Sequence, residues 1–264
     1  MKVATARPSP PCNHVNTMNS DTSIKRYFLK REEMVRFLNK LEAPDNTAKS
    51  LYIPSESLAK RLSEQHDIPP EIVDLAVKSK TGVAVFWSIS QGYAVVPPFP
   101  LTAAHSTQGY DTKPLLAMLE YDFRVALVLV RLGSYAIGLC QGENLVASKV
   151  GTGLVHGRHK KGGSSQQRFQ RHRDKQIESF LTRVCSHARE ILESHVKTVD
   201  YITYGGAWTT ILSLQKICPF LHQIDTSNLP PLLDIGEPRQ KILETAIGRV
   251  WSSSITEWHN ERKA

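Results

Sequence analysis

The chain has 264 residues, 41% of them hydrophobic, and its formal net charge is +8 at pH 7. This length and composition fit one large or two small globular domains with a real hydrophobic core. The longest apolar runs fall far short of the roughly 20 residues of a membrane helix, and no signal peptide opens the chain. These features exclude a membrane-spanning protein, and we expect a cytoplasmic one.

Four cysteines are spread widely along the chain, at Cys12, Cys140, Cys185 and Cys218. They form no Cys-x-x-Cys pair, so the spacing predicts neither a disulfide framework nor a thiolate metal site. We expect all four to be buried as small hydrophobic side chains.

The N-terminal third begins with a leader, residues 1–23, whose Pro, Ser, Thr and Asn content and lack of apolar periodicity predict disorder. Residues 24–41 place apolar side chains among alternating charges at helical spacing, which predicts a helix. Two shorter helices are predicted next, one ending at Leu62 and one spanning residues 72–77 after a proline pair.

The apolar period then changes to that of strands. Residues 82–87 and 93–96, joined by a short polar turn, predict a β-hairpin in which Trp87 packs in the core. Residues 24–108 are therefore predicted to form a small α+β domain, with a linker near residues 105–111. The second domain, residues 109–264, is predicted to begin its sheet at the apolar run 125–130, which is too short for a globular helix.

Turn residues separate the run 125–130 from two further predicted strands, and the three strands together predict an antiparallel meander. Helices and strands then alternate to the C-terminus. Gly205-Gly206 is interpreted as a tight strand-to-helix turn, and Trp208 as a core side chain. The predicted fold class is α/β (α+β), a mixed sheet with an antiparallel meander and covering helices. Its later elements are strands at 134–140 and 144–150, a helix from Phe169 to Leu192, a strand at 199–204, a helix at 207–215, a strand at 232–235 and a helix at 237–258.

Positive charge gathers between the third strand of the meander and the long helix. Residues 156–175 hold seven Lys and Arg against the single acid Asp174, so this segment carries +6 of the net +8. Inside it lies Gly162-Gly163-Ser164-Ser165-Gln166-Gln167, where glycines permit close approach to another surface and glutamines offer uncharged amides.

A cationic, glycine-containing loop of this kind is typical of contacts with a phosphate backbone, so RNA or DNA is the first partner to consider. A solvated loop without a partner is the plainer interpretation of a charge run. A zinc site at His156, His159 and His172 is a weaker hypothesis, because a nearby fourth ligand is absent.

From about Phe123 to Trp251 the order of parts resembles the central domain of eukaryotic and archaeal class I peptide chain release factors, a ribonuclease-H-like domain with a Gly-Gly-Gln loop. The chain is still more similar to the release-factor-like peptidyl-tRNA hydrolases of ribosome-associated quality control. In their bacterial branch the loop reads Gly-Gly-x-Ser-Gln, which Gly162 to Gln166 match, with Arg168-Phe169 and Arg171 downstream. Two serines separate the glycines from Gln166 here, so its reach differs from that of the tripeptide form.

The resemblance implies that Gln166 is the catalytic glutamine, with Gln167 as a second candidate, and that Gly162 and Gly163 let the loop enter the peptidyl transferase centre. It also implies phosphate contacts by a set of cations. These are Arg158, Lys160, Lys161, Arg168, Arg171 and Arg173.

The implied activity is hydrolysis of peptidyl-tRNA on the ribosome, with the large-subunit rRNA and peptidyl-tRNA as partners. We expect a monomer that needs no metal ion, no small-molecule cofactor and no membrane. Codon-reading and GTPase-binding domains are not expected, which favours action on stalled, dissociated large subunits. Two alternatives stay open: a nuclease that cuts the tRNA 3′ end, and a non-catalytic ribosome-binding factor.

Overall fold

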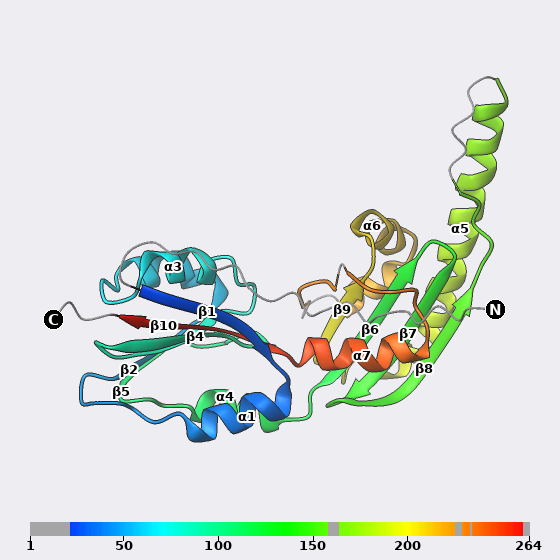
Figure 1. Cartoon of the computed structure of the whole chain (residues 1–264). Coiled ribbons are helices and arrows are strands. Elements are labelled where there is room, and N and C mark those ends of the chain that lie inside the picture. The colour runs from blue at the N-terminus through cyan, green and yellow to red at the C-terminus, as the bar shows by residue number, and fades with distance from the viewer. Residues whose placement is uncertain (1–21, 158–163, 225–228, 233, 261–264) are drawn as a thin grey trace, which may run out of the picture. The chain divides into compact units, whose positions relative to one another are not determined.

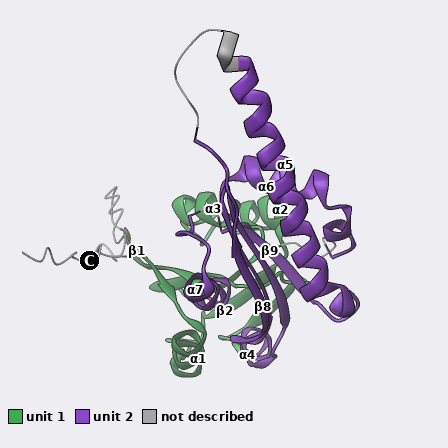
Figure 2. Cartoon of the chain, turned by 90° about the vertical axis from the view of Figure 1, so that its right-hand side faces the viewer, with its two compact units in different colours: residues 1–112, 253–264 green, residues 113–252 purple. Residues whose placement is uncertain are grey.

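The computed structural model describes residues 22–157, 164–224, 229–232 and 234–260 (Figure 1). The chain divides into two compact units, residues 1–112 together with 253–264, and residues 113–252 (Figure 2). The chain thus enters the second unit once and returns to the first for its last strand. The predicted second domain, 109–264, differs from this second unit mainly at its C-terminal end. The predicted leader lies almost wholly outside the described residues.

The first unit is built on a six-stranded sheet in the order β1-β10-β4-β3-β2-β5, in which every neighbouring pair is antiparallel. The predicted hairpin is confirmed as β3 and β4. The strands of the six-stranded sheet are β1 (Thr22–Leu29), β2 (Lys49–Ile53), β3 (Val83–Trp87), β4 (Gln91–Val96), β5 (His105–Gln108) and β10 (Ser253–Asn260).

Helices cover both faces of this sheet (Figure 1). The helices α2 (Leu58–Ser63) and α3 (Pro70–Ala76) pack with Trp87 and Trp258 in one core cluster. On the other face, α1 (Arg31–Lys40) brings Phe37 edge-on against Tyr93, with ring centroids 5.5 Å apart.

Two predicted helices were too long, because each included a strand of the first unit. Residues 24–41 divide into β1 and α1, and residues 237–258 divide into α7 (Gln240–Val250) and β10. Both misread stretches hold the partners of one antiparallel ladder, in which Ile24 lies opposite Trp258. A strand whose partner lies more than 200 residues away has no adjacent hairpin in the sequence to reveal it, and these stretches also place apolar side chains at helical spacing. The predicted linker at 105–111 likewise contains β5.

The second unit holds a four-stranded sheet in the order β8-β7-β6-β9. The antiparallel meander is confirmed, and β9 runs parallel to β6, so the predicted mixed sheet is also confirmed. Of the predicted strand at 232–235, in which residue 233 lies outside the described residues, the structure shows a parallel bridge between Leu232 and Gly205. The main helices and strands of the second unit are α4 (Lys113–Glu120), β6 (Arg124–Arg131), β7 (Ser134–Gln141), β8 (Asn144–Thr152), α5 (Ser164–Leu192), β9 (Tyr201–Gly205), α6 (Trp208–Ile217) and α7.

One face of this sheet is covered by α5 and α6, whose Phe180, Val184 and Ile211 share a core cluster with alternate residues of β6. The helix α7 covers the opposite face, where Leu243 lies against Gly138 of β7 (Figure 2). In the described parts of the chain, no helix combines the length and the apolar composition that crossing a bilayer requires.

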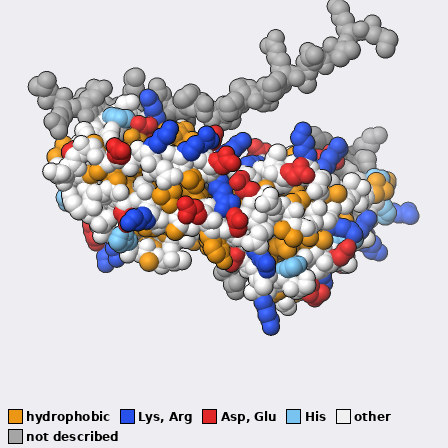
Figure 3. Space-filling model, turned by 90° about the horizontal axis from the view of Figure 1, so that it is seen from below, with side chains coloured by type: hydrophobic (Ala, Val, Ile, Leu, Met, Phe, Trp, Pro, Cys, Tyr) orange, Lys and Arg blue, Asp and Glu red, His pale blue; other side chains and the backbone are white. Residues whose placement is uncertain are grey.

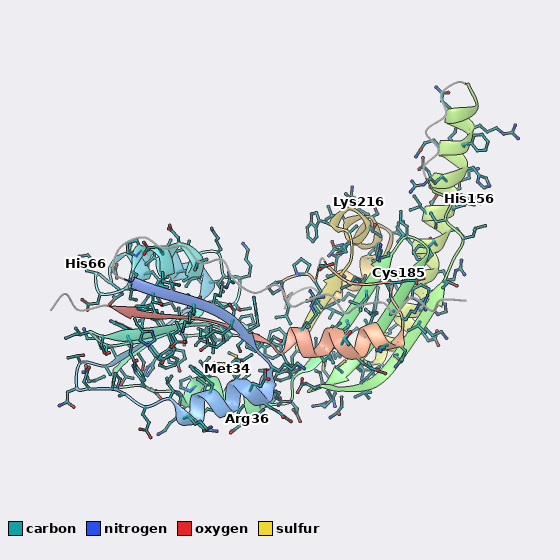
Figure 4. All side chains as sticks on the ribbon, in the orientation of Figure 1. Met34, Arg36, His66, His156, Cys185 and Lys216 are labelled. Atoms are coloured by element: carbon teal, nitrogen blue, oxygen red, sulfur yellow. A yellow bond between two sulfur atoms is a disulfide. The ribbon has the colours of Figure 1, made fainter. Side chains whose placement is uncertain are left out.

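A disulfide joins α5 to the end of α6, between Cys185 and Cys218 (Figure 4). The expectation that these two cysteines are free core residues was wrong, because the two residues, 33 apart in sequence, meet in the fold. Cys140 is free and buried, and burial raises the pKa of its thiol to about 12. Cys12 lies outside the described residues.

The turn at Gly205-Gly206 is confirmed as a tight connection between β9 and α6. Gly206 has φ +119° and its N–H donates to the carbonyl of Leu232 at 3.1 Å. A Cβ at Gly206 would lie 2.0 Å from the carbonyl oxygen of Val130. Trp208 follows directly and is 51% exposed, so its predicted place in the core was wrong, whereas Trp87 is buried as expected.

Candidate functional site

The long helix α5 carries the sequence-predicted glutamines at its N-terminal end. Side chains from Gln167 to Ser179 are exposed or half-buried, and Phe180 is the first that is fully buried. The N-terminal half of α5 accordingly extends beyond the sheet of its own unit, as two perpendicular views show (Figures 1 and 2). We call the turns of α5 up to Gln176 the arm; its described side chains, from Gln167 onward, lie outside the core cluster.

The helix begins at Ser164, so Gln166 and Gln167 both lie in its first turn. The apolar pattern predicted a start near Phe169, because turns that touch no core carry no apolar periodicity. The side chain of Gln167 is exposed. Five of the predicted site residues lie outside the described residues, namely Arg158, Lys160, Lys161, Gly162 and Gly163.

Three of the predicted RNA-binding cations lie on the outer turns of α5. Arg168 and Arg171 are exposed, as a contact to a large anionic partner requires. Arg173 differs, because its Nε donates a 2.9 Å hydrogen bond to the main-chain carbonyl of His156. Within the same turns the Nε2 of Gln170 donates a 2.7 Å hydrogen bond to Asp174, the one acid of the segment.

The chain that leaves β8 runs back along α5. We call residues 152–157 the stem, because they lead from the sheet to the glycine loop. The guanidinium of Arg183 donates to the carbonyl of Thr152 at 3.3 Å, and a Cβ at Gly153 would meet the Phe180 ring at 2.7 Å. Figure 4 shows His156 alongside the helix.

His156 is held at its main chain by two side chains of α5. Its N–H donates to the Oε1 of Gln176 at 3.2 Å, and its carbonyl accepts the bond from Arg173. Its ring lies 6.3 Å from that of His172, centroid to centroid. Sequence reasoning missed Gln176, because no spacing rule shows that a strand will return along a helix.

The chemistry of this region is that of cations and neutral amides. Among the described residues no cluster of His, Cys, Asp and Glu could hold a metal ion. His159, the third histidine of the weaker zinc hypothesis, lies outside them. On the face seen in Figure 3, basic and acidic side chains are interspersed, in contrast to the one-sided charge of residues 156–175.

Comparison with protein families gives a match over residues 123–256, to the Actinobacteria/chloroflexi VLRF1 release factor family. Among curated proteins, the peptide chain release factor subunit 1 of Thermococcus sibiricus is 25% identical over 207 residues, which cover 65% of this chain and 49% of that protein. The subunit of the same name from Pyrococcus abyssi is 31% identical over 101 residues, covering 38% of this chain and 24% of that protein. The chain therefore spans half the length of these relatives, or less.

Among solved structures, the archaeal translation termination factor aRF1 aligns with a TM-score of 0.39 and 17% identity, over 84% of this chain and 73% of that one. Dom34 of S. cerevisiae, described as a translation termination-like factor, aligns with a TM-score of 0.27 and 9% identity, over 79% of this chain and 56% of that one. Both scores lie below 0.5, so these alignments add nothing to the family match.

Proposed function

The chain belongs to the Actinobacteria/chloroflexi VLRF1 release factor family, and we propose that it hydrolyses the ester bond of peptidyl-tRNA on the ribosome, freeing a stalled nascent chain. The observation that carries this proposal is the projecting arm. The arm carries Gln166 and Gln167 in its first turn and exposes Arg168 and Arg171, and its described side chains lie outside the core cluster. Such an arm can reach an ester that lies deep within RNA.

The reaction requires a water molecule to attack the ester carbonyl while the tRNA ribose oxygen leaves and takes up a proton. A glutamine amide does not titrate near neutral pH, so Gln166 cannot serve as a general base. Its part is to orient the water and to donate a hydrogen bond to the developing oxyanion, which commonly contributes about 2.7–4 kcal/mol.

The partners are tRNA and the rRNA of the large subunit. Arg168 and Arg171 contact phosphates from the outer turns of the arm, and Arg158, Lys160 and Lys161 do so from the glycine loop. Gly162 and Gly163 allow that loop to approach the RNA closely. Action on ribosomes places the protein in the cytoplasm.

The test is incubation of the purified protein with stalled peptidyl-tRNA complexes of the large subunit, followed by analysis of both products. We expect free peptide together with a tRNA that keeps its intact 3′ CCA end. Peptide that still carries nucleotides would identify a nuclease, and binding without any release would identify a non-catalytic factor. Either result would overturn the proposal.

A further inference from the structure

The two hydrogen bonds at His156 restrain the backbone on both sides of that residue. The N–H belongs to the peptide plane before His156 and the carbonyl to the plane after it. A residue has only two soft backbone dihedrals, and both are determined once its two flanking peptide planes are held. The bonds to Gln176 and from Arg173 therefore restrict φ and ψ of His156 together.

Contacts nearer the sheet show that the stem and the helix run side by side over matching lengths. From Thr152 to His156 the stem advances about 13 Å, and from Arg183 to Arg173 the helix advances about 15 Å. Both ends of this run are tied, at Thr152 to Arg183 and at His156 to the pair Arg173 and Gln176. Val155 lies between them against the core cluster.

We propose that Arg173 and Gln176 are positioning residues that clasp the main chain of His156 and so set the direction in which the glycine loop leaves the stem. This inference rests on the proposed function, because the direction matters only if the loop delivers a glutamine to the ester. Seven residues, 157–163, join His156 to the start of α5. With one end held by the helix itself, the clasp defines the other end of this short connection.

The clasp changes the role expected for Arg173. If Arg173 were only a phosphate contact, Arg173→Lys would keep the charge, and any loss would appear in ribosome binding and hence in KM. A clasp requires the Nε of a guanidinium at 2.9 Å from the His156 carbonyl, and an ammonium on a longer, more flexible stem does not reproduce that geometry. Similarly, the Oε1 of Gln176 acts as an acceptor, so glutamate can replace glutamine but leucine cannot.

The experiment compares Gln176→Leu, Gln176→Glu and Arg173→Lys with wild type. One readout is the hydrogen-exchange rate of the His156 amide, and the other is kcat and KM for peptide release from stalled complexes. We expect Gln176→Leu to speed exchange at least about tenfold, and both Gln176→Leu and Arg173→Lys to lower kcat about tenfold with KM within about twofold. Gln176→Glu should restore exchange and kcat.

Gln170→Leu is the matched control, because it removes a glutamine hydrogen bond of the same helix that ends on Asp174 rather than on the stem. It should leave exchange at His156 and kcat unchanged. Unchanged exchange in Gln176→Leu, or faster exchange with wild-type kcat, would overturn the clasp. If the wild-type protein protects the His156 amide but releases no peptide, the proposed function is rejected. The positioning role then falls because it depends on that function, although the hydrogen bonds at His156 are present.

Discussion

At the scale of single residues, the two exposed arginines Arg168 and Arg171 have an expected role that salt can test. Each phosphate contact releases counterions, so the slope of log affinity against log salt reports how many contacts are made. We expect Arg168→Ala combined with Arg171→Ala to weaken ribosome binding and to reduce that slope by about 2. Binding is measured by co-sedimentation with large subunits between low and physiological salt.

Arg189→Ala serves as the control for the arginine pair. Arg189 lies near the buried end of the same helix and bonds Glu193 at 2.8 Å. Its loss should leave the salt slope as in wild type. A double variant with an unaltered slope would show that Arg168 and Arg171 do not meet phosphates.

Gly206 permits a residue-scale prediction about stability. Its φ of +119° is one that L side chains rarely adopt, and a Cβ there would meet the Val130 carbonyl oxygen at 2.0 Å. We expect Gly206→Ala to lower the free energy of unfolding of the second unit by about 2 kcal/mol or more. Urea denaturation measures this change. A Gly109→Ala variant is the control, because its φ is also positive but a Cβ would meet nothing within 4 Å.

At the scale of elements, the disulfide ties the arm helix to its neighbour. It closes a loop with a sequence separation of 33, for which chain entropy gives a stabilisation of roughly 3–4 kcal/mol. Cys140 does not compete for exchange, because its raised pKa keeps the buried thiol protonated. Reduction of Cys185–Cys218 should therefore lower the melting temperature of the second unit by about 10 °C.

The measurement for the disulfide is thermal unfolding with and without reductant, with the redox state read by mass. The double variant Cys185→Ala and Cys218→Ala should melt at a lower temperature and should not respond to reductant. A wild-type melting temperature that stays constant while the bond is reduced would rule out a stabilising disulfide.

Elements differ in how far the sequence could predict them. The strands β6, β7 and β8 were predictable because consecutive apolar runs separated by turn residues pair with each other. The ladder of β1 with β10 was not, because its partners lie at opposite ends of the chain. The start of α5 at Ser164 was missed for a third reason, since exposed turns show no apolar pattern.

The same limits apply to the candidate site. The glycine and glutamine motif and its cations could be identified from residue types alone. The stem clasp could not, because Gln176 is an ordinary polar side chain on a helix until the stem is placed beside it. Arg173 was identified for its charge, whereas the structure gives it a specific main-chain partner.

At the scale of the whole molecule, the last strand, β10, belongs to the same sheet as the strands of residues 22–108. β10 lies between β1 and β4, and its Trp258 is fully buried in the core of the first unit. A protein that ends at Ser252 should therefore lose the fold of residues 22–112. The second unit should stay folded, because its core cluster lies wholly within residues 113–252.

Hydrogen exchange with peptide mapping distinguishes the two units of the truncated protein. We expect residues 22–112 to exchange rapidly and the strands β6 to β9 to remain protected. Protection throughout residues 22–112 in the truncated protein would show that β10 is dispensable for the sheet.

The central claim concerns the amide at the tip of the arm, and peptide release by Gln166→Ala tests it most directly. The measurement is the single-turnover rate of peptide release from stalled large-subunit complexes, with ribosome binding determined in parallel. The account predicts a fall of about 10²–10³-fold in Gln166→Ala, with binding near wild type and a smaller effect in Gln167→Ala. Release by Gln166→Ala at the wild-type rate would contradict it.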